Sequence, residues 1–113
     1  MTTKIHVDSD TLAMLQEIME GGFGPLLESY LSDGESRIRD LEQAYNDHDF
    51  DQLRRTAHSL KGSSGNVGAT QMADLCLLVE QRGKEEELDG VESLLSEIHR
   101  EFSAVRDIMT GYL

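Results

Sequence analysis

The chain contains few of the residues that mark strand-rich, disulfide-bonded or membrane-spanning proteins. Its 113 residues include one proline, one cysteine, no tryptophan, three tyrosines and three phenylalanines. A single cysteine excludes a disulfide within the chain and any metal site built from several thiolates. No stretch approaches the roughly 18 apolar residues of a transmembrane helix, and the N-terminus lacks the apolar run of a signal peptide. We therefore expect a cytoplasmic protein that makes no use of a membrane.

Positive charge is also scarce. The sequence has 10 Lys and Arg residues against 22 Asp and Glu residues, which gives a formal net charge of −12. Contacts to phosphate supply much of the affinity for nucleic acids, so this balance argues against a protein that binds DNA or RNA. The length is enough for one modest core, and we expect residues 1–113 to form a single domain.

Apolar residues recur at helical spacing along most of the chain, which predicts five helices. Asp8 or Ser9 is the expected cap of the first helix, and the glycines at 21, 22 and 24 are expected to end it. Asp49 with Gln52, and Asp89 with Glu92, have the spacing of capping boxes for two later helices. The expected helices are Ser9–Glu20, Pro25 to about His48, a helix capped by Asp49 that ends near Asn66, Ala69–Gln81, and a last helix from Asp89 to about Tyr112.

Short connections between long amphipathic helices are typical of bundles. We therefore predict an all-α fold, an antiparallel four-helix bundle with a short additional N-terminal helix packed across one end. The core-facing positions of the third helix are Leu53, Ala57, Leu60 and Ser64, and Cys76 is predicted to be a buried thiol on the fourth helix. A bundle that closes all its amphipathic faces favours a monomer.

One histidine lies on the outward face of the third helix. His58 is roughly a third of a turn away from the centre of the core stripe. Its helical neighbours at i−4, i+3, i+4 and i+7 are Arg54, Lys61, Gly62 and Gly65. Glycine within a helix costs about 1 kcal/mol relative to alanine, so two glycines beside one exposed ring indicate the close approach of another molecule. The cations indicate an anionic visitor, as expected for a nucleophile that accepts a phosphoryl group.

The run His58-Ser59-Leu60-Lys61-Gly62-Ser63-Ser64 resembles the motif of the histidine-containing phosphotransfer (HPt) domain. The resemblance continues through Asn66-Val67-Gly68-Ala69 and Met72-Ala73-Asp74-Leu75-Cys76, and the length and helix spacing fit nearly the whole chain as a stand-alone HPt protein. It implies a phosphorelay intermediate of a two-component system, without kinase activity. The phosphoryl group would pass from a receiver-domain aspartate of a hybrid sensor kinase to His58, and then to an aspartate of a response regulator.

The resemblance also assigns roles around the histidine. His58 would be the phosphoacceptor, Lys61 would stabilise the phosphoryl charge, Gly62 would give the receiver clearance, and Arg54 or Arg55 would be an auxiliary cation. No cofactor of its own is expected, and magnesium would be supplied by the partner receiver domain.

Three features stay open at the level of the sequence. Some HPt domains place a glutamine of the fourth helix near the phosphoacceptor, and an ungapped count puts that position at Glu80, with Gln81 beside it. The apolar residues of the first helix are either buried on two sides or form an exposed patch where receiver domains dock. The other three histidines are predicted to be solvated or partly packed, with His6 in a disordered start, His48 in a turn and His99 beside the core stripe.

Three other functions compete with the relay. The dimerising helices of a sensor kinase also present a histidine, but there an acidic residue and a proline follow it, whereas Ser59 and Gly62 do so here. A helical interaction module that binds receiver domains or other signalling proteins without phosphoryl transfer is the main alternative. A bundle with an incidental surface histidine would not need the two glycines and the flanking cations.

Overall fold

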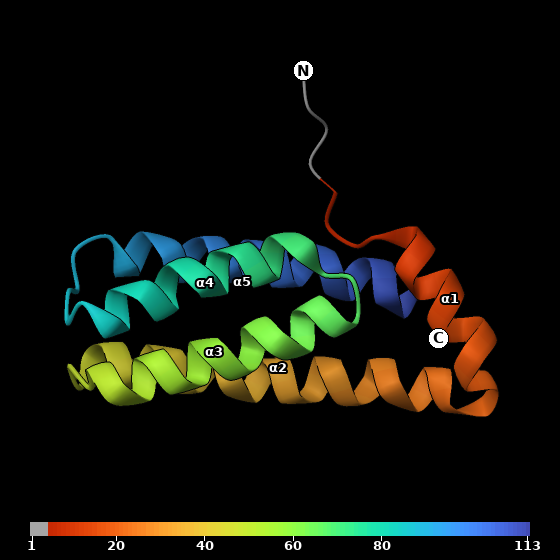
Figure 1. The fold of residues 1–113 in the computed structure, drawn as a ribbon, viewed down its shortest axis with the longest axis horizontal. Coiled ribbons are helices and arrows are strands. Elements are labelled where there is room, and N and C mark those ends of the chain that lie inside the picture. The colour runs from red at the N-terminus through yellow and green to blue at the C-terminus, as the bar shows by residue number, and fades with distance from the viewer. Residues whose placement is uncertain (1–4) are drawn as a thin grey trace, which may run out of the picture.

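The computed structural model describes residues 5–113, and this part of the chain is helical with short turns and no strand. The all-α prediction is confirmed. The elements are α1 (Ser9–Met19), the 3-10 helix η1 (Glu20–Gly22), α2 (Phe23–Asn46), α3 (Phe50–Asn66), α4 (Thr70–Lys84) and α5 (Val91–Thr110). Figure 1 shows α2, α3, α4 and α5 side by side along the long axis, and the shorter α1 at the end where α2 begins.

Two aspartates cap helices as the sequence predicts. The Asp8 carboxylate accepts a hydrogen bond from the backbone N–H of Asp10 at 3.0 Å, and that of Asp49 accepts from the N–H of Gln52 at 3.0 Å. Each satisfies an amide that has no partner within its helix. The reciprocal half of the Asp49–Gln52 capping box does not form, because the Asp49 N–H donates to the Ala44 carbonyl at 2.9 Å and the Gln52 amide donates to the Thr56 hydroxyl.

The glycine-rich segment after α1 does not separate the first two helices as predicted. Only the turn η1 lies between them, and α2 begins at Phe23, two residues before the predicted start. Pro25 is therefore the third residue of α2 rather than the first. Proline is compatible with this place because the first amides of a helix have no intrahelical acceptor in any case.

The predicted limits of the last two helices are also wrong. The fourth helix does not end before Gly83 but continues to Lys84, with Gly83 buried within it. The fifth helix starts at Val91 and is capped by Gly90, which adopts a left-handed φ of 81°, and not by Asp89. Both differences concern glycines: Gly83 was predicted to follow the end of its helix, and Gly90 was predicted to lie inside the next one.

The core lies between the four long helices and contains the predicted stripe of α3, since Leu53, Ala57, Leu60 and Ser64 are all buried. The Ser64 hydroxyl is hydrogen-bonded to the buried Tyr30 hydroxyl of α2 at 2.7 Å, and burial raises the pKa of that phenol. The face of α3 opposite His58 is thus fixed to the bundle by apolar packing and by a satisfied polar pair.

Cys76 is buried, as predicted, and burial raises the pKa of its thiol to about 12. A thiol with this pKa stays protonated near neutral pH and is a poor nucleophile. Cys76 therefore belongs to the core of the fold rather than to its chemistry.

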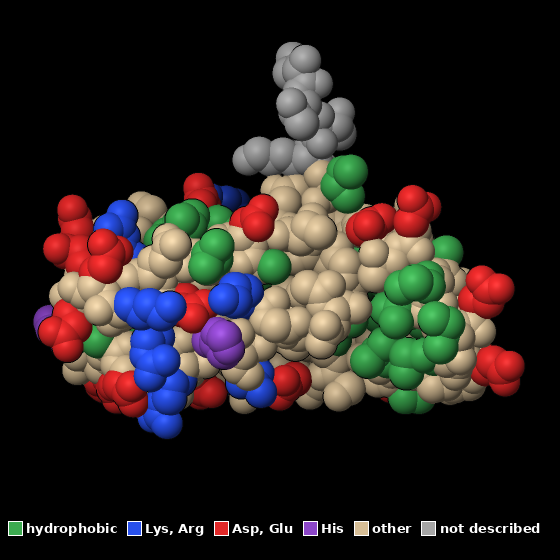
Figure 2. All heavy atoms as spheres, viewed as in Figure 1, with side chains coloured by type: hydrophobic (Ala, Val, Ile, Leu, Met, Phe, Trp, Pro, Cys, Tyr) green, Lys and Arg blue, Asp and Glu red, His purple; other side chains and the backbone are tan. Residues whose placement is uncertain are grey.

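The apolar side chains of α1 are divided between the core and the surface. Leu12 is fully buried, whereas Met14, Ile18 and Met19 are exposed, with Ile18 at 69% of its maximum. Figure 2 shows hydrophobic side chains gathered over this end of the molecule, on the same face as a histidine that lies over α3. Of the two readings left open by the sequence, the exposed patch is the one that the structure supports.

Residues 5–8, which precede α1, make defined contacts with the bundle where the sequence predicted disorder. The imidazole of His6 contacts the carboxylate of Glu101 on α5, with Nδ1 at 2.8 and 2.9 Å from its oxygens. The backbone N–H of Asp8 donates to the carbonyl of Gly68 in the turn between α3 and α4 at 2.9 Å. The prediction of a disordered start at His6 is therefore wrong.

The remaining histidines lie where they were expected. His48 is in the turn between α2 and α3, with a φ of 55°. His99 is exposed on α5 and contacts Glu42 of α2 at 3.1 Å. Across residues 5–113, none of the helices combines the length and the apolar character needed to cross a membrane.

Candidate functional site

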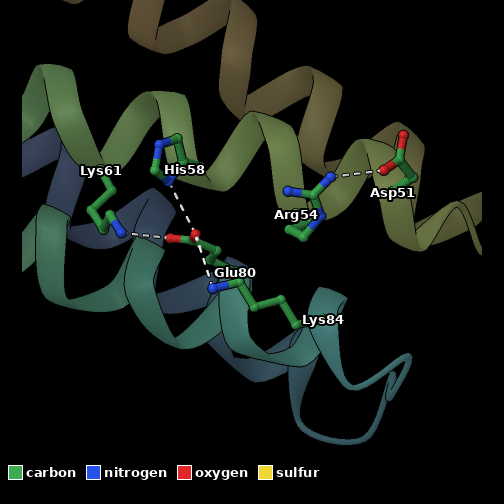
Figure 3. A network of polar contacts seen from close by, with 6 residues as sticks. All are labelled: Asp51, Arg54, His58, Lys61, Glu80 and Lys84. Carbon is green, nitrogen blue, oxygen red and sulfur yellow. Dashed lines mark hydrogen bonds and ion pairs between the residues drawn. The ribbon is translucent and has the colours of Figure 1, made fainter.

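His58 projects from the middle of α3 into solvent, with 66% of its side chain exposed. Its helix is held from the opposite side by the buried stripe, so the ring is presented on a rigid element. Figure 3 shows the imidazole directed from α3 toward α4, where three charged side chains meet. The prediction of an outward-facing histidine is confirmed by this geometry.

Glu80 of α4 is the centre of the polar network around His58. Its side chain is 5% exposed, and its two oxygens are shared among three nitrogen groups. Oε2 lies 3.0 Å from Nδ1 of His58 and 3.8 Å from Nζ of Lys84, while Oε1 accepts from Nζ of Lys61 at 2.7 Å. The carboxylate is thus surrounded by positive or hydrogen-bearing groups, as a nearly buried charge requires.

The hydrogen bond from Lys61 holds the pKa of the Glu80 carboxyl below its ordinary value. Burial acts in the opposite direction, and the hydrogen bond from His58 acts with Lys61. Glu80 is therefore ionised at neutral pH. This is the residue that the sequence left undecided: Glu80 approaches the phosphoacceptor candidate, while its neighbour Gln81 is exposed.

A glycine on α4 brings the two helices close enough for these contacts. A Cβ atom on Gly83 would lie 2.9 Å from the backbone nitrogen of Arg54 and 3.0 Å from its Cα. No other residue fits there without moving a helix backbone. Glu80 lies three residues before Gly83, and His58 lies four residues after Arg54, so the close approach at one point sets the two side chains opposite each other.

Gly62 leaves open space one helical turn from His58, and Gly65 leaves open space on the following turn. A Cβ atom built on either residue would have no atom within 4 Å outside its own helical turn. The absence of a side chain at these positions is therefore not required by packing within residues 5–113. The geometry agrees with the sequence-based expectation that the space serves an approaching molecule.

Arg54 is directed away from the network. Its guanidinium donates to the Asp51 carboxylate at 2.9 Å, and the neighbouring Arg55 pairs with the same carboxylate at 3.0 Å. Figure 3 shows Arg54 turned toward Asp51 on its own helix. Of the four predicted site residues, the structure therefore brings His58, Lys61 and Gly62 together, while Arg54 lies at the edge.

Chemically, the site offers a nucleophilic nitrogen on an exposed ring, with positive charge nearby. Figure 2 shows blue Lys and Arg side chains beside a purple histidine on an open surface. Among residues 5–113, no group of three or more His, Cys, Asp and Glu side chains is arranged to hold a metal ion. An open site of this kind suits a reaction whose other half is carried by a protein partner.

The sequence is similar to those of known signalling proteins. Multistep phosphorelay regulator 1 of Schizosaccharomyces pombe is 34% identical over 85 residues, which cover 70% of this chain and 29% of that protein. Chemotaxis protein CheA of Halobacterium salinarum is 29% identical over 107 residues, and the match covers 16% of its length. The chain thus spans less than a third of these two relatives.

Solved structures match over much more of their length. The crystal structure of histidine-containing phosphotransfer protein B (HptB) of Pseudomonas aeruginosa superposes with a TM-score of 0.94 at 37% identity, covering 97% of this chain and 96% of that one. Residues 25–108 match the Hpt domain family, and this range contains all of the His58 network. The chain therefore belongs to the Hpt domain family.

Proposed function

We propose that the protein is a phosphorelay intermediate that accepts a phosphoryl group on His58 and passes it to another protein. The observation that carries the proposal is the exposed imidazole of His58, next to Lys61 and beside the open space left by Gly62. The names of the relatives support it, since they include a phosphorelay regulator and histidine-containing phosphotransfer proteins.

In the proposed reaction the phosphodonor is a phosphoaspartate, so the leaving group is a carboxylate. A ring nitrogen of His58 attacks phosphorus, the new N–P bond forms, and the P–O bond to the donor aspartate breaks. The electron pair of that bond leaves with the aspartate carboxylate. Lys61 supplies positive charge near the transferred group, and Gly62 provides the clearance that lets the donor reach in-line geometry. The reverse steps deliver the group to a second aspartate.

The proposed partners are receiver domains, one in a hybrid sensor kinase and one in a response regulator. Magnesium would be held by the receiver and not by this chain, which acts as a carrier and not as a kinase. We also propose that receivers dock on the exposed patch of α1 formed by Met14, Ile18 and Met19, since flexible methionines suit surfaces that fit more than one partner.

The bundle supports this role as a rigid platform. We propose that α2–α5 form an antiparallel four-helix bundle in one domain, with α1 packed across its end, and that the protein acts as a cytoplasmic monomer. Gly83 lies against Arg54, and Glu80 contacts His58. Residue numbers therefore decrease along α4 in the direction in which they increase along α3, which supports an antiparallel arrangement of the two helices. The match to HptB over almost all of both chains supports a carrier of one domain.

Transfer from a phosphorylated receiver domain tests the proposal. The purified protein is mixed with a receiver that carries radiolabelled phosphate on its aspartate, and the label on each chain is followed. We expect label that survives alkali, is lost in acid and does not appear on His58→Gln, with unchanged helix content in that variant because the side chain is exposed. Absence of label with a panel of receivers that nevertheless bind would support the alternative, an interaction module without transfer.

A further inference from the structure

The nearly buried carboxylate of Glu101 on α5 lies outside the His58 network and has no part in the proposed phosphoryl transfer. Its side chain is 9% exposed, and both of its oxygens face Nδ1 of His6, at 2.8 and 2.9 Å. We propose that His6 and Glu101 form a clasp that positions α1, and with it the surface to which receivers bind. This inference rests on the proposed function, because it assumes receivers that dock on the exposed patch of α1.

The first step concerns the burial of the carboxylate. A carboxylate removed from water needs a partner that replaces its lost hydrogen bonds. Within residues 5–113, His6 supplies the only side-chain hydrogen bond to Glu101. A carboxylate only accepts hydrogen bonds, so the ring directs an Nδ1–H toward it. Loss of the imidazole would leave Glu101 without this donor, which costs more than loss of a contact between two exposed groups.

The second step concerns the backbone that follows His6. Val7 is buried, and the N–H of Asp8 donates to the carbonyl of Gly68 at 2.9 Å. Gly68 has a left-handed φ of 79°, and a Cβ atom on it would be 3.0 Å from the Cβ of Thr11 on α1. Glycine is thus favoured there by its backbone conformation and by the close approach of α1. This segment therefore brings the start of α1 onto the turn between α3 and α4.

The third step is that α1 itself supplies little of its attachment. Leu12 is the one buried residue of the helix, and an isolated helix of 11 residues is marginal in water. The far end of α1 continues through η1 into α2, whereas its first turn is held by the segment that His6 anchors. Figure 2 shows the apolar patch on the face that also carries the histidine over α3. The clasp therefore sets how α1 presents this patch, without taking part in the chemistry.

Two variants and a matched control test the clasp. His6→Ala removes the donor, and Glu101→Met removes the charge but keeps a long unbranched side chain in the buried position. His99→Ala is the control, because the His99 imidazole also contacts a glutamate of a neighbouring helix, at 3.1 Å, but with the two side chains 52% and 46% exposed.

Each protein is measured in three ways. Hydrogen exchange of the α1 amides reports how firmly the helix is attached. Titration with a receiver domain gives the affinity, and the transfer rate at saturating receiver gives the chemical step after binding. Uptake from phosphoramidate, a small donor that needs no docking, reports the reactivity of His58 alone.

In His6→Ala and Glu101→Met we expect the α1 amides to exchange about 10-fold faster and the receiver to bind about 5-fold more weakly. The transfer rate at saturation and the uptake from phosphoramidate stay at the wild-type values, and His99→Ala matches wild type throughout. His6→Gln keeps an N–H donor and recovers part of the loss. The double variant loses no more than either single one, because each removes the same contact.

Wild-type exchange of α1 in both single variants, or an unchanged affinity despite faster exchange, overturns the inference. Losses that add in the double variant also overturn it, since the two residues would then act independently. A wild-type protein that binds receivers but takes up no phosphoryl group contradicts the proposed function alone, because exchange and affinity still test the clasp.

Discussion

Lys61 is the cation that hydrogen-bonds to Glu80, at 2.7 Å, whereas Lys84 lies 3.8 Å away and Arg54 and Arg55 pair with Asp51. Lys61→Ala removes the group that holds the Glu80 carboxylate and that offsets charge near the phosphoryl group. We expect phosphoryl uptake from a receiver domain to slow on the order of 10-fold or more, as for loss of one preorganised electrostatic partner. Rapid-quench measurement of the transfer rate checks this.

The matched control for this prediction is Arg55→Ala, because Arg55 is a more exposed cation on the same helix that pairs with Asp51. It is expected to transfer at nearly the wild-type rate. Equal losses in Lys61→Ala and Arg55→Ala would show that general positive charge, and not the contact with Glu80, is what matters.

Gly62 offers a second prediction for a single residue. A side chain there meets no other part of the bundle, and alanine is a better helix former, so Gly62→Ala is expected to raise the free energy of unfolding by about 0.5–1 kcal/mol. Gly62→Gln is expected to keep the fold and to block transfer from a receiver, because the added bulk occupies the approach to His58. Urea unfolding and the transfer assay measure the two effects.

Gly65→Gln is the control, since Gly65 is equally open but lies seven residues from His58. Transfer at the wild-type rate in Gly62→Gln would remove clearance as the reason for the glycine. A loss of equal size in both variants would mean that the receiver covers both turns of α3.

The sequence predicted His58, Lys61 and Gly62 because all three lie within one local run of α3. Glu80 and Gln81 became candidates only through the position of a glutamine in some HPt domains, and the sequence did not distinguish between the two residues. The choice depends on how α4 is rotated against α3, which is set by the packing of Gly83 on Arg54, and no local pattern contains that information. The pairing of Arg54 with Asp51 has the i,i+3 spacing of an ion pair within one helix, so it is a contact that a local pattern contains.

At the scale of helices, hydrophobic periodicity and the aspartate caps located the elements well. The errors concern glycines. Gly83 reads as a helix end in a local pattern, although its real role is contact with a neighbouring helix. Gly90 was predicted to be the first residue of the last helix, after a cap at Asp89, although its left-handed φ of 81° makes it the residue before α5. Tertiary contact and backbone conformation decide these positions, and propensity does not.

The packing of α3 on α4 gives a prediction for Gly83. In Gly83→Ala the new Cβ atom would be 2.9 to 3.0 Å from the backbone of Arg54, so the helices have to separate. We expect the free energy of unfolding to fall by about 1–3 kcal/mol, in the range of overpacked cores. We also expect the contact between His58 and Glu80 to weaken. Urea unfolding reports the first effect, and nitrogen-15 NMR of the His58 imidazole reports the second.

Gly65→Ala serves as the comparison, because it adds the same atom to a helical glycine with free space around it. It is expected to be neutral or stabilising. If Gly83→Ala were as stable as Gly65→Ala, the close approach of α3 and α4 would not depend on the glycine.

For the whole molecule, Glu80 makes stability depend on pH. The pKa of its carboxyl is below the ordinary value of 4.5, chiefly because of the Lys61 hydrogen bond. A carboxyl with a lower pKa in the folded state stabilises that state above its unfolded-state pKa, and the contribution disappears as the pH falls through the folded-state value. We therefore expect the stability of wild type relative to Glu80→Gln to be constant near neutral pH and to fall as the pH drops below 4.5.

Urea unfolding of both proteins from about pH 7 to about pH 3 measures this difference. The exposed Asp51 carboxyl also has a lowered pKa, from hydrogen bonding to Arg54, and it changes both proteins equally. Parallel stability curves for wild type and Glu80→Gln would contradict the assignment of the low pKa to Glu80.

The attachment of α1 has a consequence for how such a protein diversifies. The family match starts at residue 25, whereas the exposed patch lies on α1 before it. The segment that leads into α1 is held by a few contacts, among them His6 with Glu101 and Asp8 with Gly68. None of these residues contributes to the His58 network. The proposed docking patch and the proposed phosphoacceptor therefore occupy separable parts of the chain, and we expect substitutions on α1 to change the choice of partner without altering the His58 network.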